Sequence, residues 1–350
     1  MKIYLPKPYL LAFVALALFF QACKKETPST PQLPETIKPP PPIGFVVAGY
    51  FPSYRSVAEY PDRMFRMCNV INYAFANITA ANTVSISNTL RMDSVYKKGK
   101  ANGAKIFLSI SGDAGLFASM SNNAGGRNVF VKDLMQKVRQ YNLDGIDIDW
   151  EYPRTTDGTS EFYRFLMKEL SDSLHTGGKY YLSAAITPGL YSGSIRDGIK
   201  NEIFGYADFL NVMMYDDFTT DPSRLYQQHS PYEILPTSFN YWISRGLPSQ
   251  KLVIGIPVYG RPSGMTQSGT ALAYKTIIQQ GGNPQSDSAI MTAPGFSLYK
   301  IYYNGRQTVK KKAAYAKSFG GGIMFWEIGQ DTNDDLSLIK AACDTIGRIY

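Results

Sequence analysis

The sequence predicts an α/β protein folded as a (β/α)8 TIM barrel, with a short insertion between strand 7 and helix 7. Eight apolar runs of β type alternate with amphipathic helical stretches along the chain. Strands that alternate with helices are parallel and are joined by right-handed crossovers. About 300 residues follow the N-terminal region, which suits eight such units and one insertion. A doubly wound open sheet is the alternative, but no glycine-rich dinucleotide turn follows the first strand.

The expected strands are short apolar runs that favour β structure. In chain order they are Phe45–Phe51, Val70–Ala76, Lys105–Ser109, Gly145–Trp150, Tyr180–Ile186, Phe209–Met214, Leu252–Val258 and Gly322–Trp326.

Helical periodicity follows most of these strands. The clearest stretches are Leu90–Asn102, Asn128–Tyr141, Ser160–His175, Tyr232–Arg245, Thr308–Phe319 and Leu336–Tyr350. The first and fifth helices are expected near Pro61–Met67 and Ile195–Phe204. Pro262–Tyr303, after strand 7, is rich in Ser, Gly, Gln and Thr, which predicts a small decorated loop.

The N-terminal segment is expected to be a targeting signal rather than part of the fold. Lys2 and Lys7 precede an apolar run, Leu10–Phe20, that is too short to span a bilayer. Ala22 followed by Cys23 resembles a bacterial lipoprotein signal, in which the cysteine is lipidated. Residues 1–22 would then be removed, leaving an extracytoplasmic protein that a lipid anchors to the outer membrane or cell surface. A plain secretory signal is the alternative.

Residues 23–42 form the next segment, with seven prolines between Pro28 and Pro42. Such a composition predicts an extended tether without a core of its own. The folded catalytic domain is expected to cover residues 43–350. We expect it to be a monomer.

The distribution of charge argues against a nucleic-acid partner, and the number of cysteines argues against a disulfide scaffold. The formal net charge is +8, but basic residues are scattered, so a nucleic-acid partner is not expected. The one basic run, Lys310–Lys312, is expected to lie on a solvated helix face. Cys68 and Cys343 are expected to be buried free thiols, because two cysteines in so long a chain make no disulfide scaffold.

A row of acids marks the fourth strand. Asp147, Asp149 and Glu151 alternate with Ile148 and Trp150, so the carboxylates share one face and the apolar side chains share the other. Asp is a poor strand former and like charges repel, so a solvated edge strand explains the row poorly. We therefore expect the row inside the barrel, ending at its mouth, with Trp150 packed outside.

The alternative for these acids is a Ca²⁺ or Mg²⁺ site. His175 and His229 are not at ligand spacing, and the aromatic character of the other strand ends makes a metal the weaker interpretation. Those ends carry Tyr50, Phe75, Ser111, Met213-Met214-Tyr215-Asp216, Tyr259-Gly260-Arg261 and Phe325-Trp326-Glu327. Active sites of such barrels are built where the strands end.

The stretch Asp144–Pro153 resembles the Asp-x-x-Asp-x-Asp-x-Glu signature of glycoside hydrolase family 18, the chitinase family. The resemblance extends to Met213–Asp216, Tyr259–Arg261 and Gly321–Glu327. It implies a (β/α)8 barrel that cleaves β-1,4 links between N-acetylglucosamine units of chitin or its oligosaccharides, without metal or cofactor. Ser111 replaces a glycine of the family pattern at the end of strand 3, so we expect altered sugar contacts there. The insertion is shorter than in family members with a deep cleft, so we expect a more open groove.

The family resemblance also implies roles. Glu151 would be the general acid, and like charges in the row would raise the pKa of at least one member. This family uses the substrate's own acetamido group in place of an enzyme nucleophile. Asp149 and Tyr215 would orient that group and Asp147 would hold Asp149. The sugar site would be lined by Tyr50, Phe75, Tyr152, Met213, Asp216, Arg261 and Trp326. Asp144 has the wrong parity and is expected to be structural.

Two other functions remain open at this point. An endo-β-N-acetylglucosaminidase acting on N-glycans would use the same acids. A non-catalytic sugar-binding protein on the same barrel is a different class, and such relatives typically lose the terminal Glu of the signature, which is present here as Glu151.

Overall fold

A computed structural model describes Met1 and residues 36–217, 227–262 and 271–350. Its centre is a closed barrel of parallel strands in the order β1-β13-β8-β7-β6-β5-β4-β2, closed by pairing of β1 with β2. The barrel strands are β1 (Val46–Pro52), β2 (Val70–Ile78), β4 (Lys105–Ser111), β5 (Gly145–Ile148), β6 (Tyr181–Ile186), β7 (Phe209–Val212), β8 (Leu252–Pro257) and β13 (Gly322–Trp326). The predicted (β/α)8 fold is confirmed.

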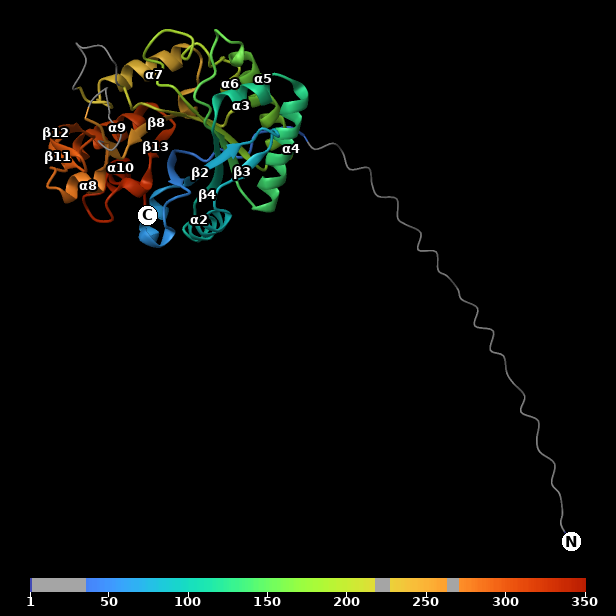
Figure 1. The fold of residues 1–350 in the computed structure, drawn as a ribbon, viewed down its shortest axis with the longest axis horizontal. Coiled ribbons are helices and arrows are strands. Elements are labelled where there is room, and N and C mark those ends of the chain that lie inside the picture. The colour runs from blue at the N-terminus through green and yellow to red at the C-terminus, as the bar shows by residue number, and fades with distance from the viewer. Residues whose placement is uncertain (2–35, 218–226, 263–270) are drawn as a thin grey trace. The chain divides into compact units, whose positions relative to one another are not determined.

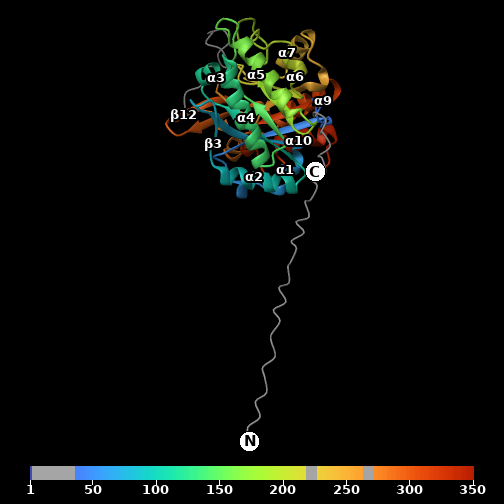
Figure 2. The ribbon, with the colours of Figure 1, turned by 90° about the vertical axis from the view of Figure 1, so that its right-hand side faces the viewer.

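Helices cover the outside of the barrel, with α2 and α7 on opposite sides (Figures 1 and 2). They are α1 (Asp62–Met67), α2 (Thr89–Ala101), α3 (Ala114–Ser121), α4 (Ala124–Gln140), α5 (Thr159–Leu174), α6 (Ile203–Tyr206), α7 (Ile234–Ser244), α9 (Arg306–Phe319) and α10 (Leu338–Ile346). A short strand, β3 (Val84–Ile86), pairs antiparallel with β2. The sequence did not predict α3 or β3.

Two predicted elements are too long. The strand that carries the acid row ends at Ile148, and Asp149 continues it only through a hydrogen bond from its amide to the carbonyl of Ile110 (2.8 Å). The helix expected near Ile195–Phe204 is wrong over most of its length, since only α6 is helical there. The residues before α6 form turns instead, and Gly198 packs closely on the Pro153 carbonyl, where a Cβ would lie 2.2 Å away.

The insertion after β8 is not the simple loop that the sequence predicted. Its described residues form β9 (Tyr259–Gly260), β10 (Leu272–Ala273), α8 (Tyr274–Gln279) and a hairpin of β11 (Ser288–Ala293) with β12 (Phe296–Tyr302). Figure 1 shows this hairpin at one edge of the barrel. Tyr274, Ile277, Met291 and Ile301 are buried and belong to the main apolar core, so the insertion is packed on the barrel.

The barrel interior is apolar at one end and polar at the other. At the amino-terminal end of the strands, Phe107 stacks on Tyr181 and packs against Phe209, with ring centroids 5.9 Å apart in both pairs. Towards the carboxyl-terminal end, the interior side chains are Asp147 and its polar neighbours. The polar end is therefore the place for a functional site.

Several predictions about the rest of the chain can be compared with the structure. Cys68 and Cys343 are buried free thiols, as predicted. Lys312 is fully buried, so the expectation that Lys310–Lys312 is wholly solvated is wrong. Among the described residues, no helix is both long and apolar enough to cross a membrane.

Residues 2–22 of the predicted signal peptide, Cys23 and most of the tether lie outside the described residues, so their roles stay predictions. The last part of the tether is described and contacts the barrel. Ile37 forms a bridge with Thr176, and the Tyr181 hydroxyl donates to the Pro41 carbonyl (2.8 Å). These contacts lie at the amino-terminal end of the strands.

Candidate active site

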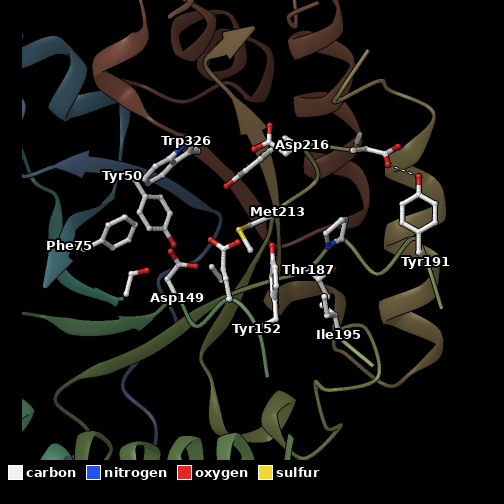
Figure 3. A pocket seen from close by; sticks show the side chains of 16 residues that line it. Tyr50, Phe75, Asp149, Tyr152, Thr187, Tyr191, Ile195, Met213, Asp216 and Trp326 are labelled. Atoms are coloured by element: carbon white, nitrogen blue, oxygen red, sulfur yellow. Dashed lines mark hydrogen bonds between the residues drawn. The ribbon is translucent and has the colours of Figure 1, made fainter. Parts of the chain in front are cut away.

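A cleft of about 660 Å³ opens where the barrel strands end. It is lined by Tyr50, Phe75, Ser111, Asp149, Glu151, Tyr152, Ala185, Thr187, Pro188, Tyr191, Ile195, Met213, Tyr215, Asp216, Asp217 and Trp326. Figure 3 shows Tyr50, Phe75 and Trp326 on one side of Asp149, and Tyr191 and Ile195 on the other. The structure thus brings most of the predicted site residues into one elongated cleft.

Asp147 lies below the cleft, fully buried in the barrel. Its Oδ2 accepts hydrogen bonds from the hydroxyls of Ser109 (2.7 Å) and Tyr50 (2.8 Å), and its Oδ1 accepts from Ser183 (2.7 Å) and Asn211 (3.2 Å). Burial raises the pKa of Asp147 above its ordinary value, and the four donors offset only part of this rise. All four hydrogen bonds fix the Asp147 carboxyl group at the bottom of the cleft, beneath Asp149.

Asp149 has a different environment. It is 7% exposed, and its Oδ1 has no hydrogen-bond partner among the described residues. Burial raises its pKa well above the ordinary value, and the nearby charges of Glu151 and Asp147 raise it further. Asp149 therefore holds a proton more readily than an ordinary carboxyl group, and one of its oxygens is buried without a partner among the described residues.

Glu151 is solvent-exposed and lines the cleft beside Tyr152. Its direction follows from the residue before it. Trp150 is buried outside the barrel, stacked on Phe117 with ring centroids 5.1 Å apart and edge-on to Tyr163. Because the indole is fixed on the helix side, the carboxyl groups on either side of it are directed to the cleft, as strand parity predicted.

An aromatic wall closes one side of the cleft. Phe75 stacks on Trp326 at 5.6 Å, and Tyr50 meets the same indole edge-on at 5.4 Å. Glu327, next in the chain, is fully buried and pairs with Arg55. This ion pair fixes the chain just after the indole, so the wall is held before any ligand arrives.

Tyr215 and Asp216, which follow β7, also line the cleft. Arg261 donates to both carboxylate oxygens of Asp216 (2.6 and 2.9 Å), and the Tyr259 hydroxyl donates to Oδ1 (2.7 Å). Burial raises the pKa of Asp216, but hydrogen bonds and charges from His229 and Arg261 bring it down to about 2. Arg261 was expected to line the cleft; in the described structure it instead binds the Asp216 carboxylate and is not among the lining residues.

Several lining residues were missed by sequence reasoning. Thr187 and Pro188 directly follow β6, a strand whose end was not considered, so its position in the barrel could have revealed them. Tyr191 donates to Asp217 (2.5 Å), joining the segments that follow β6 and β7; these segments lack the periodicity that marks a strand or helix. Asp144 is structural, since it accepts from the Ile106 amide (2.7 Å) and pairs with Lys100.

Comparisons with known proteins agree with this geometry. The model of Glycosyl hydrolases family 18 matches residues 46–331. Chitinase A1 of Niallia circulans is 28% identical over 298 residues, which cover 67% of this chain but only 41% of that protein. The solved structure of the family 18 chitinase ChiB from the chitin utilization locus of Flavobacterium johnsoniae has 28% identity and a TM-score of 0.70, covering 87% of this chain and 94% of its own.

A similar structure with a different name is the chitinase-like agglutinin of Robinia pseudoacacia. It has 26% identity and a TM-score of 0.72, and the match covers 86% of this chain and 99% of the agglutinin. Proteins named as chitinases and a protein named as an agglutinin therefore share the fold. The match of the family model over most of the barrel, with the acid row at its centre, shows that the chain belongs to glycosyl hydrolases family 18.

Proposed function

We propose that the protein is a chitinase-type hydrolase that cleaves β-1,4 links between N-acetylglucosamine residues with retention of configuration. The observation that carries this proposal is the pair formed by Asp149 and Glu151. Asp149 has a buried oxygen without a partner among the described residues, and Glu151 faces open cleft beside it. An unsatisfied buried carboxyl oxygen destabilises a protein unless a ligand satisfies it. A sugar acetamido N–H supplies the missing donor.

In the proposed reaction Glu151 donates a proton to the glycosidic oxygen as the bond to the anomeric carbon breaks. The acetamido carbonyl oxygen of the same sugar bonds to that carbon, forming a cyclic oxazolinium ion. Asp149 accepts a hydrogen bond from the acetamido N–H, and Tyr215 donates to the acetamido oxygen, so the group is aligned for attack. Glu151, now a carboxylate, takes a proton from a water molecule. The water oxygen bonds to the anomeric carbon as the bond from that carbon to the acetamido oxygen breaks, which opens the oxazolinium ring and restores the acetamido group.

The cleft walls support a sugar ligand. The Trp326 indole is partly exposed in the cleft and offers a flat apolar face to the sugar ring. The Asp216 carboxylate stays ionised because its pKa is about 2, so it remains an acceptor for a sugar hydroxyl at any working pH. Chitin or an N-acetylglucosamine oligosaccharide is the ligand class that combines these needs.

The test is turnover and binding by Glu151→Gln, measured with N-acetylglucosamine oligomers of defined length. We expect turnover to fall by roughly 10²–10⁴-fold, the usual contribution of a general acid, while the dissociation constant changes only a few-fold. Asp217→Asn is the matched control, because it also removes an acid that lines the cleft. It should retain most turnover. Unchanged turnover in Glu151→Gln would refute the assignment.

The same assays separate the competing functions. A wild-type protein that binds the oligomers without cleaving them would be a non-catalytic sugar-binding protein. Release of glycan from a high-mannose glycoprotein in preference to cleavage of the oligomers would indicate an endo-β-N-acetylglucosaminidase.

A further inference from the structure

The chain has two histidines, and they lie beyond opposite ends of β7. At the amino-terminal end, His175 Nε2 lies 3.1 Å from Oδ2 of Asp208, the residue before the strand. At the carboxyl-terminal end, His229 Nδ1 lies 3.2 Å from Oδ1 of Asp216. Both imidazoles are buried. Only the second pair is beside the cleft, since Asp216 lines it.

Asp216 forms a tight turn that needs support. Its φ is 57°, in the left-handed region that residues other than glycine adopt only at a conformational cost. His229 binds this turn twice. Its Nδ1 lies 3.3 Å from the amide of Asp216, and its main-chain carbonyl accepts from the amide of Asp217 (2.8 Å). One residue therefore engages two consecutive amides of the turn.

The Asp216 contact does not depend on which ring nitrogen carries the proton. If Nδ1 is unprotonated it accepts from the Asp216 amide, and if it is protonated it donates to the Asp216 carboxylate. In both forms the imidazole is bound to the same residue. The ring also packs on Tyr259, with centroids 5.2 Å apart, and Tyr259 itself donates to Asp216.

His229 is in turn held from outside the barrel. The next residue, Ser230, donates its hydroxyl hydrogen to the Met214 carbonyl (2.6 Å). Lys312, on α9, contacts both the carbonyl and the hydroxyl of Ser230 at 2.7 Å, and the Asn304 side chain donates to the same carbonyl (2.8 Å). These contacts fix the segment that carries His229 against the chain that carries Tyr215.

We propose that His229 is a positioning residue, which holds the turn at Asp216 so that Tyr215 and Asp216 face the acetamido group and hydroxyls of the bound sugar. This inference rests on the proposed function, because it assigns His229 a part in the same site. His229 does not touch the sugar and acts only through the turn. Displacement of the Tyr215 phenol would affect the aligned transition state more than it affects binding of the remainder of the oligomer.

The experiment compares His229→Leu and His229→Asn with His175→Leu. Leucine fills the space but cannot hydrogen-bond, whereas the Asn side chain carries an acceptor and a donor close to the position of Nδ1. His175→Leu is the matched control, because it also breaks a buried His–Asp pair on β7, at the end away from the cleft. Each variant is assayed for kcat and KM on a short chromogenic N-acetylglucosamine oligomer and for Tm.

We expect kcat of His229→Leu to fall roughly tenfold, the value of one hydrogen bond, with KM within about threefold. His229→Asn should recover most of this loss, and His175→Leu should lower Tm without lowering kcat. If His229→Leu does not fold, His229→Gln takes its place. The Gln side-chain amide lies near the position of Nε2 rather than Nδ1, so it should not bind the Asp216 turn and kcat should fall as expected for Leu. Equal kcat losses at both histidines, or no recovery by Asn, would overturn the proposal.

Failure of the proposed function is a separate result. If the wild type binds oligomers without cleaving them, the hydrolase activity is wrong, but the positioning role is still measured. In that case His229→Leu should weaken oligomer binding by about two- to threefold, while His229→Asn and His175→Leu should leave the dissociation constant unchanged. Unaltered affinity in His229→Leu would then refute the positioning role as well.

Discussion

Gly255 on β8 offers a way to displace Tyr215 without altering any polar group of the site. A Cβ built on Gly255 would lie 2.6 Å from the Val212 carbonyl oxygen and 2.9 Å from Cε1 of Tyr215. Ordinary van der Waals contact begins near 3.4 Å, so Gly255→Ala must move the chain at Val212 as well as the Tyr215 ring, which needs a shift of 3.4 − 2.9 = 0.5 Å from its present position.

The expected magnitudes follow from this shift. Overpacking of a tight interior lowers the free energy of unfolding by about 1–3 kcal/mol. Catalytic groups must be held within about 0.5 Å of their working position, and a displacement of ~1 Å can lower the rate about 100-fold. We therefore expect kcat on N-acetylglucosamine oligomers to fall by roughly tenfold or more in Gly255→Ala.

Gly145→Ala is the matched control. Its Cβ would meet the Tyr181 carbonyl oxygen at 2.6 Å and the Phe107 ring at 2.9 Å, almost the same distances as at Gly255. Phe107 belongs to the stacked cluster at the other end of the barrel. Urea unfolding should show similar losses for the two variants, with kcat lowered in Gly255→Ala alone. Equal kcat values would refute the view that Tyr215 needs this position.

Two further predictions concern buried charges. Asp147→Asn should lower the free energy of unfolding by about 2–4 kcal/mol, because the amide nitrogen of Asn cannot accept a hydrogen bond and leaves two of the four buried donors unpaired. Ser183→Ala, which removes one donor, should lower it by only about 1–2 kcal/mol in the same urea titration. For Lys312, burial lowers the pKa from 10.5 to about 7, so between those pH values the unfolded chain binds more protons than the folded one. Wild-type stability relative to Lys312→Met should therefore rise between pH 7 and 10.5, by up to about 1.4 kcal/mol per pH unit, and a flat difference would contradict the shifted pKa.

The barrel and the acid row were predictable because they depend on short-range periodicity. Apolar runs revealed the strands, and a period of two assigned Asp147, Asp149 and Glu151 to the interior face and Trp150 to the exterior face. The same reasoning placed Asp144 outside the row. These assignments need no knowledge of which distant residues meet.

Contacts between distant segments were less accessible. The pairing of Arg261 with Asp216, and the role of His229 beside them, depend on three loops that periodicity does not relate. Lys312 was assigned to a solvated face because lysine is seldom fully buried. Ser230, whose carbonyl and hydroxyl oxygens accept from the buried Lys312 ammonium group, lies far from it in the sequence.

The Asp147 carboxylate also bears on how the barrel can vary in evolution. It lies on β5, and its four hydrogen-bond donors come from four other strands, through Tyr50 on β1, Ser109 on β4, Ser183 on β6 and Asn211 on β7. A slip of one residue in any strand moves its side chains to the opposite face. An insertion or deletion of a single residue within any of these strands would therefore move a donor to the outside of the barrel. The Asp147 carboxyl group would then lose one of its four hydrogen bonds. Length changes should accordingly accumulate in the segments between these strands, while the strands themselves keep a common register.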